Sequence, residues 1–145
     1  MLLANSQIAF CLVMLLAIWE GMVIGVSFIA TPVKFRAFGL SRAVALDVGR
    51  LTFAVFGRVE LGLGLAATTA ALFLPKSLYV VGSLLLLGIV VMQNSWLLPV
   101  LTHRAEAVGR GDELAPSAAH HVYAALEGIK VIVLSLCLVA MAVAA

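Results

Sequence analysis

Four apolar stretches, each longer than the roughly 20 residues that a membrane-spanning helix needs, follow one another along the chain. None of them has the strict apolar–polar alternation of a barrel strand, and each is far longer than such a strand. The pattern therefore predicts an all-α, polytopic membrane protein, a single domain over residues 1–145. Because the connections are short, successive helices are expected to pack as an antiparallel four-helix transmembrane bundle. The predicted spans are residues 8–31, 51–74, 77–101 and 120–144.

Prolines and charged loops mark the expected ends of these helices. Pro32 and Pro75 are expected to end the first and second helices, because proline has no backbone N–H with which to continue a helix. Residues 33–50 and 102–119 form two charged loops, the second of which contains the helix breaker Pro116. The first loop is loosely amphipathic, so part of it is expected to lie along a membrane surface.

Composition narrows the class of protein. Of the 145 residues, 64% are apolar and 11% are charged, against about 45–50% and about 25% in soluble domains. A soluble fold of this size leaves about a third of its surface in water, so it has no room to bury so much apolar surface. A soluble enzyme and a disordered tail are excluded, and the absence of a basic run excludes a nucleic-acid partner. Cys11 and Cys137 are expected to be small buried hydrophobes, with a bridge between them as the alternative.

The distribution of positive charge predicts an orientation. Outside the spans, six Lys or Arg residues lie in the two charged loops and one, Lys76, lies on the other side. The positive-inside rule then places those loops in the cytoplasm and both termini outside, with the chain in the inner (plasma) membrane and the lipid bilayer as its surroundings. The N-terminus lacks a positive region, and the apolar run after it is too long for a cleaved signal, so a retained span is expected.

Several polar side chains fall inside the predicted spans, where they are costly and usually face the bundle interior. In the fourth span, steps of three, four and three residues place the polar members on one face. Because the first two spans run in opposite directions, Glu20 and Glu60 are expected at similar depth. The sequence therefore predicts one buried polar layer. The candidate ligand- or ion-binding residues are Glu20, Arg58, Glu60, Gln93, Asn94, His120, Tyr123, Glu127 and Lys130.

This layer is compatible with several kinds of chemistry. Carboxylates and histidines such as His103 and His120 are suitable metal ligands, but the Glu-x-x-His pattern of four-helix carboxylate proteins is absent. A haem would need a second histidine at the depth of the first. A stripe of carboxylates, tyrosine and histidine is also typical of a proton relay. No catalytic residue, metal or cofactor is assigned, and whether the chain is an enzyme stays open.

Small residues mark the expected packing faces. Gly21 and Gly25 lie on one face of the first helix, and this spacing permits close helix approach. Gly57, Gly64 and Ala71 form a similar stripe on the second helix. Contact inside the bundle is the main interpretation, and a homo-oligomer face is the alternative.

The residues carry a resemblance to a known family. Residues 25–35 have the form G-x-x-F-x-x-x-P-x-x-F, and the segments QNSWLLPVLTHR (93–104) and HVYAALEGIK (121–130) follow in order. Together they resemble the transmembrane-protein-205-like family, a four-helix membrane domain of unknown function whose eukaryotic member is associated with resistance to platinum drugs. A looser likeness, through Trp19 and Gly21, is to bacterial copper-resistance membrane domains, although the histidine expected before that tryptophan is absent. The resemblance implies a fold more than an activity.

Three functions follow as hypotheses. The first is a small transport or ion- or metal-handling protein, with Glu20, Glu60 and Glu127 as binding carboxylates. Arg58 and Lys130 would be their charge partners. The second is a membrane-embedded redox or metal-dependent enzyme acting on a lipophilic substrate at the same layer. The third is a structural or assembly subunit of a membrane complex, in which the layer only sets helix register.

Overall fold

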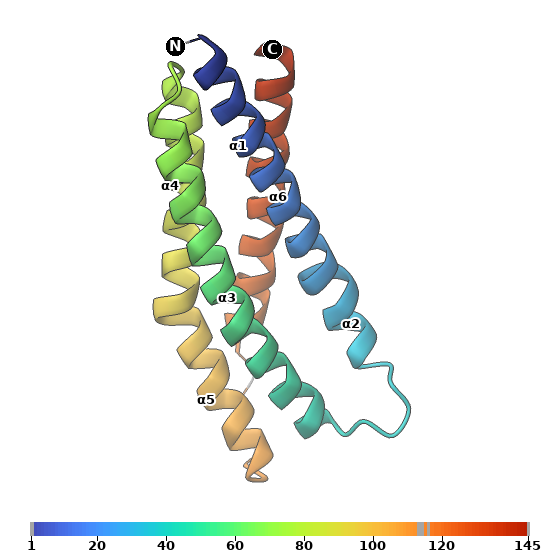
Figure 1. The fold of residues 1–145 in the computed structure, drawn as a ribbon. Helices are drawn as coiled ribbons and strands as arrows, with labels where there is room; N and C mark the ends of the chain where they lie inside the picture. The colour runs from blue at the N-terminus through green and yellow to red at the C-terminus, as the bar shows by residue number, and fades with distance from the viewer. Residues whose placement is uncertain (1, 113–114, 116, 145) are drawn as a thin grey trace.

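The computed structural model describes residues 2–112, 115 and 117–144, and all regular structure within them is helical (Figure 1). The predicted all-α fold is confirmed for this part of the chain. Pro116, which was predicted to be a helix breaker in the second loop, lies outside the described residues. The helices form four continuous columns. Their bounds are α1 Leu2–Val23, η1 Ile24–Ala30 and α2 Thr31–Lys34 in the first column, α3 Arg42–Leu72 in the second, α4 Ser77–Met92, η2 Gln93–Leu97 and α5 Leu98–Gly109 in the third, and α6 Ala119–Ala144 in the fourth.

Each column contains a stretch long and apolar enough to cross a membrane. These stretches have 30, 31, 33 and 25 residues, and about 20 residues suffice at 1.5 Å per residue. The chain reverses direction at each connection, and both termini lie at the same end of the bundle (Figure 1). The polar connections between α2 and α3 and between α5 and α6 lie at the other end.

The first and third columns each continue through a proline, contrary to the expectation that Pro32 ends the first helix. In both columns a π-helical segment, η1 or η2, precedes the proline, and Pro32 and Pro99 then occupy the first turn of α2 and α5. Proline is tolerated there because N–H groups of a first turn need no partner in the preceding turn. In the wider π turn the backbone N–H of Thr31 donates to Val26 O, five residues earlier, and Thr31 Oγ1 donates to the same carbonyl at 2.8 Å. The helix therefore reaches Lys34.

The second helix begins earlier than predicted. Residues from Arg42 onward, expected to belong to a loop until residue 50, are already the first turns of α3. Ser41 adopts an extended conformation and its side chain accepts a hydrogen bond from Val44 N at 3.3 Å, which caps the helix. Gly39 precedes it with a φ of 78°, a conformation that glycine adopts without strain. A serine cap after this glycine sets the start of α3.

The core lies along the axis where the columns meet, around Trp19. This side chain is fully buried, and apolar residues of all four columns pack around it. The members of the core with the least exposure are Leu12, Leu16, Val23, Ala67, Ala71, Leu86, Val90 and Leu134. The two predicted glycine stripes behave differently. Gly57 and Gly64 are buried against neighbouring helices, whereas a Cβ added at Gly21 or Gly25 would have no neighbour within 4 Å.

The two cysteines are free, so the alternative of a Cys11–Cys137 bridge is not realised. Cys11 is exposed on the outside of α1, contrary to the expectation of burial. Cys137 is half-buried against Gly82, where an added Cβ would lie 2.6 Å from its sulfur.

Gly57 joins α3 to η2 and gives a testable prediction. Asn94 Nδ2 donates to Gly57 O at 3.3 Å and to Val90 O at 2.9 Å, and a Cβ at residue 57 would collide with this amide. We expect Gly57→Ala to lower the free energy of unfolding by about 1–3 kcal/mol, because the amide must move and lose a partner. Titration of the purified protein with a denaturing detergent measures this change.

Gly62→Ala is the matched control, since it lies on the same helix with open space around it. It should leave stability unchanged or raise it by up to about 1 kcal/mol, the intrinsic advantage of alanine in a helix. Equal stabilities for the two variants would contradict the close contact at Gly57.

Candidate functional site

Three ionisable side chains meet in the middle of the bundle, and we call Glu60, Glu127 and Lys130 the buried charge cluster. Their exposed fractions are 1%, 1% and 0%. Lys130 Nζ lies 2.5 Å from Glu60 Oε1 and 2.7 Å from Glu127 Oε1. The ammonium also lies 5.9 Å from the centre of the Phe56 ring. One lysine of α6 thus bridges two carboxylates, one from its own helix and one from α3.

Hydrogen bonds extend the cluster to the other two columns. Trp19 Nε1 of α1 donates to Glu60 Oε1 at 3.0 Å. Glu127 receives two further donors, Ser27 Oγ at 2.7 Å and Gln93 Nε2 at 2.8 Å. Each column therefore contributes at least one polar side chain to a single network.

Both π-helical segments position a donor of this network. Ser27 lies in η1 and Gln93 lies in η2, and each donates to Glu127. Insertion of a π turn rotates the residues that follow it, and such turns occur frequently at functional sites. The same two irregularities that accommodate Pro32 and Pro99 thus lie at the level of Glu127.

The charges and hydrogen bonds of the cluster are not balanced. Two carboxylates share one ammonium, so the fully ionised cluster carries one net negative charge away from water. Gln93 is 1% exposed, and its Oε1 accepts no hydrogen bond from any described residue. A buried acceptor without a donor is costly, and so is a buried net charge. One added proton would neutralise the cluster, and a water or another small donor would satisfy the Gln93 oxygen.

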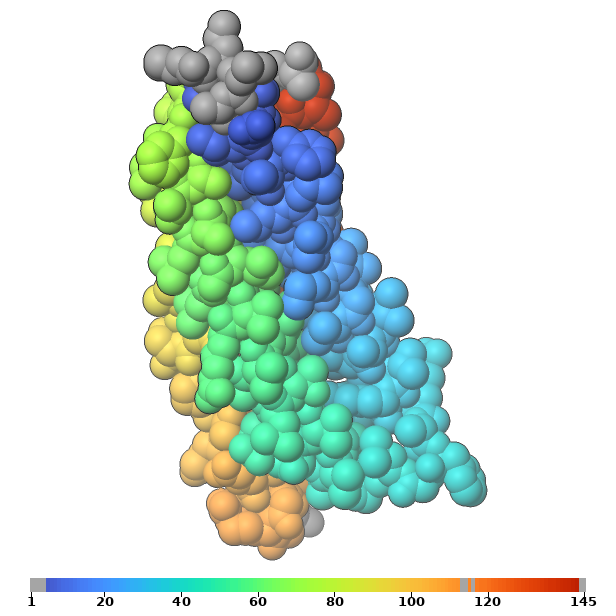
Figure 2. Space-filling model, in the orientation of Figure 1, coloured from blue at the N-terminus to red at the C-terminus, as the bar shows by residue number. Residues whose placement is uncertain are grey.

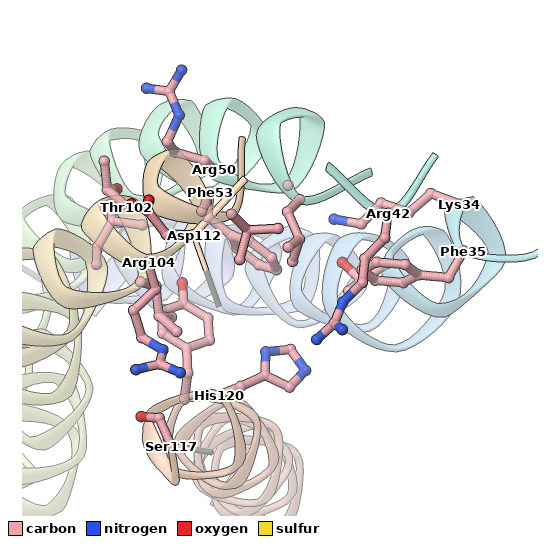
Figure 3. Close-up of a pocket in the computed structure, with 18 of the residues that line it drawn as sticks. Lys34, Phe35, Arg42, Arg50, Phe53, Thr102, Arg104, Asp112, Ser117 and His120 are labelled. Carbon is pink, nitrogen blue, oxygen red and sulfur yellow. The ribbon is translucent and has the colours of Figure 1, made fainter. Parts of the chain in front are cut away.

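A cavity of about 790 Å³ opens beside the cluster at the end of the bundle that carries the polar connections. We call it the cationic cavity. Side chains of α2, α3, α5, α6 and the segments next to them line it (Figure 3). The labelled polar members of its lining are Lys34, Arg42, Arg50, Thr102, Arg104, Asp112, Ser117 and His120.

The inner end of the cavity lies one helical turn from the charge cluster. Tyr123 and Thr31 line the cavity, and Glu127 and Ser27 follow them one turn further along α6 and η1, about 6 Å away along each axis. Tyr123 is 4% exposed and packs edge to face on Phe53, with ring centres 5.0 Å apart. Both rings line the cavity.

The predicted site residues fall into four groups. The structure brings Glu60, Gln93, Glu127 and Lys130 together, with Tyr123 one turn away. Glu20 and Asn94 lie near this network without joining it, since Glu20 Oε1 accepts from Ser135 Oγ and Asn94 bonds to backbone carbonyls. His120 lines the cavity. Arg58 is exposed on α3 and forms no ion pair with any described residue.

Sequence reasoning missed several contributors. Trp19, Ser27 and Ser135 each donate to a buried or half-buried carboxylate. The carboxylate partner of Ser27 is 100 residues away in the chain. Lys34 and Arg42 had been counted only as loop charges. No local pattern identifies these partners, because each contact joins two different columns.

The described residues do not form a suitable set of metal ligands. Among residues 2–112, 115 and 117–144, no group of three or more His, Cys, Asp or Glu side chains is placed to hold one. His103 is exposed, and the rings of His120 and His121 meet edge to face with centres 6.2 Å apart at the start of α6. In the buried charge cluster, the Lys130 ammonium lies at hydrogen-bond distance from both carboxylates. It therefore occupies the position between them that a metal cation would take.

Comparison with known proteins identifies a family without a described activity. No curated protein and no solved structure matches the chain. Residues 14–110 match a domain of unknown function, DUF4149. This stretch includes Trp19, Glu60 and Gln93 and ends before α6, so Glu127 and Lys130 lie outside the matched region. This match covers more than half of the chain, and the chain therefore belongs to the DUF4149 family.

Proposed function

We propose that the protein crosses the inner (plasma) membrane four times as an antiparallel bundle, with both termini outside the cytoplasm. Four long apolar helices support the crossing. Six Lys and Arg residues lie in the two polar connections or in the helix segments next to them, against one, Lys76, at the other end, and this distribution supports the orientation. In this orientation the cationic cavity opens to the cytoplasm. Within the DUF4149 family, we propose that the nearer relatives of this chain are the transmembrane-protein-205-like proteins.

We further propose that the protein is a small transport protein that binds a proton at the buried charge cluster. The observation that carries this proposal is the pairing of two fully buried carboxylates with one ammonium, since such a cluster is neutral only after it takes up one proton. Intramembrane carboxylates are costly, and proton relays are a common use for them.

Three polar side chains share one face of α6 from the cavity inward: Tyr123 comes first, then Glu127 and Lys130. Ser135, which donates to Glu20, lies five residues beyond Lys130 and about 140° around the helix from it. Over these residues the helix rises about 18 Å. Beyond Ser135 the axis is closed by apolar side chains, among them Leu12 and Met141. A proton entering from the cavity is therefore stopped at the cluster until the bundle changes shape, which is the behaviour of a binding site in a transporter and not of an open pore.

Proton flux into liposomes tests the proposal. We expect Glu127→Gln and Glu60→Gln to reduce pH-dependent flux to the level of protein-free liposomes, because glutamine keeps the shape of a carboxylic acid but neither takes up nor releases the proton. A pH-sensitive dye trapped in the lumen measures this flux.

Glu106→Gln is the control, since Glu106 is an exposed carboxylate on α5 whose nearest ion-pair partner is 3.8 Å away. It should leave flux unchanged. Unchanged flux in both core variants, or no flux with the parent protein, would contradict a proton-transport function. Normal folding with loss of a co-purifying partner would instead favour the role of an assembly subunit.

A further inference from the structure

The described lining of the cationic cavity has an excess of positive charge. Among the residues that the structure describes, four Lys or Arg side chains line it, against one carboxylate, that of Asp112. Asp112 pairs with Arg110 at 3.5 Å, and Arg50 pairs with Asp47 at 2.7 Å and points away from the middle of the cavity (Figure 3). Within the described part of the chain, the cations of the cavity therefore outnumber the acidic groups that could pair with them.

Two of these cations have no acidic partner among the described residues. Lys34 and Arg42 form no ion pair with any residue that the structure describes, and both reach into the space between α3 and α6 (Figure 3). Arg104 is partly satisfied, since its Nη2 donates to Ala115 O at 2.5 Å. Lys34 and Arg42 are thus the two groups best placed to receive an anion.

The ammonium of Lys34 is held in place by its surroundings. It lies directly over Gly49, where an added Cβ would collide with Nζ. The ring centres of Phe35 and Phe53 lie 5.1 and 5.9 Å away. A half-buried cation without a carboxylate is energetically costly, so a bound anion at this position would be stabilised by removing that cost.

Apolar side chains also line the cavity, and a purely ionic ligand would make no use of them. Leu46, Phe53 and Leu98 form much of the wall. Next to it, the connection between α2 and α3 stands out from the bundle (Figure 2) and presents Phe38, whose side chain is fully exposed. Aromatic and basic side chains in one short segment are typical of the boundary between membrane and water.

From this combination we infer that the cationic cavity binds the headgroup of an anionic phospholipid. Lys34 and Arg42 donate to the phosphate oxygens, Arg42 with the two-pronged geometry that suits phosphate, and the acyl chains face the apolar lining. Basic pockets between membrane helices on the cytoplasmic side bind such headgroups in other proteins. The inference rests on the proposed membrane location, but it uses no residue of the buried charge cluster.

Calorimetric titration of the detergent-solubilised protein tests this inference with three probes, short-chain phosphatidylglycerol, short-chain phosphatidylcholine and inorganic phosphate. We expect phosphatidylglycerol to bind most tightly. The double variant Lys34→Gln/Arg42→Gln should weaken its binding by roughly 25-fold, about fivefold for each cation removed. Gly49→Ala, which keeps every charge but displaces the Lys34 ammonium, should weaken it as well.

Arg36→Gln is the matched control, because Arg36 is an exposed cation of the same connection that does not line the cavity. It should bind phosphatidylglycerol like the parent protein, and monodispersity checks the fold of every variant. Equal affinity for the two lipids, undiminished binding in the double variant, or binding of inorganic phosphate as tight as that of phosphatidylglycerol would overturn the inference. Because Glu60→Gln and Glu127→Gln should retain the lipid, failure of the proton site and failure of the lipid site are distinguishable.

Discussion

Lys130→Met is expected to lower the free energy of unfolding by about 3–5 kcal/mol, the largest effect of any single substitution in the charge cluster. Lys130 is fully buried and lies within 2.7 Å of an oxygen of both Glu60 and Glu127. Without it, two carboxylates face each other away from water with no opposite charge between them. Denaturing-detergent titration of the purified protein measures the loss.

Two comparisons separate charge from volume in this result. The triple variant Lys130→Met/Glu60→Gln/Glu127→Gln should recover most of the lost stability, because neutral glutamines need no counter-ion. Lowering the pH should recover part of the stability of Lys130→Met alone, since added protons neutralise the facing carboxylates. Lys76→Met, at the exposed turn between α3 and α4, should change stability by no more than about 0.5 kcal/mol. A triple variant as unstable as the single variant would show that the loss comes from packing.

Trp19→Ala is expected to cost about 3–5 kcal/mol of stability, because it empties the centre of the core and removes a hydrogen bond. Trp19 is fully buried and donates to Glu60 at 3.0 Å. Trp19→Phe keeps most of the volume and should cost about 1.5–3 kcal/mol, the usual value of a hydrogen bond to a charged group. The same detergent titration measures both variants.

Trp96 provides the control for this pair. Its side chain is 58% exposed on η2, so Trp96→Phe should change stability by no more than about 0.5 kcal/mol. If Trp19→Phe were as stable as the parent protein, the hydrogen bond to Glu60 would contribute nothing and Trp19 would act by packing alone.

Pro32 and Pro99 show that the local sequence does not by itself determine where a helix of this protein ends. Pro32 was expected to end a helix because proline interrupts the i→i−4 hydrogen-bond pattern. The chain instead changes to a π-helical pattern before Pro32, and again before Pro99, so that each proline starts a new α-helical segment. Which solution the backbone chooses depends on the neighbours that hold the π turn, and a sequence pattern does not contain them.

The opposite directions of Arg58 and Glu60 could have been predicted from the sequence. Both were assigned to one polar layer because they lie at similar depth. Residues two apart on a helix point in nearly opposite directions, so burial of Glu60 at 1% exposure leaves Arg58 on the outer face. Depth along a helix and direction around it are separate quantities, and both must agree before two side chains are assigned to one site.

The sequence alone determined that the chain folds into four long apolar helices, because runs of more than 20 such residues allow no other hydrogen-bonded backbone in lipid. It also determined which face of α6 is polar, because helical periodicity places Tyr123, Glu127 and Lys130 together. Only the tertiary structure decided that Lys130 bridges Glu60 and Glu127, that Trp19 and Ser27 complete the network, and that Lys34 and Arg42 line a cavity. These contacts join residues up to 100 positions apart, and their geometry follows from how whole helices pack.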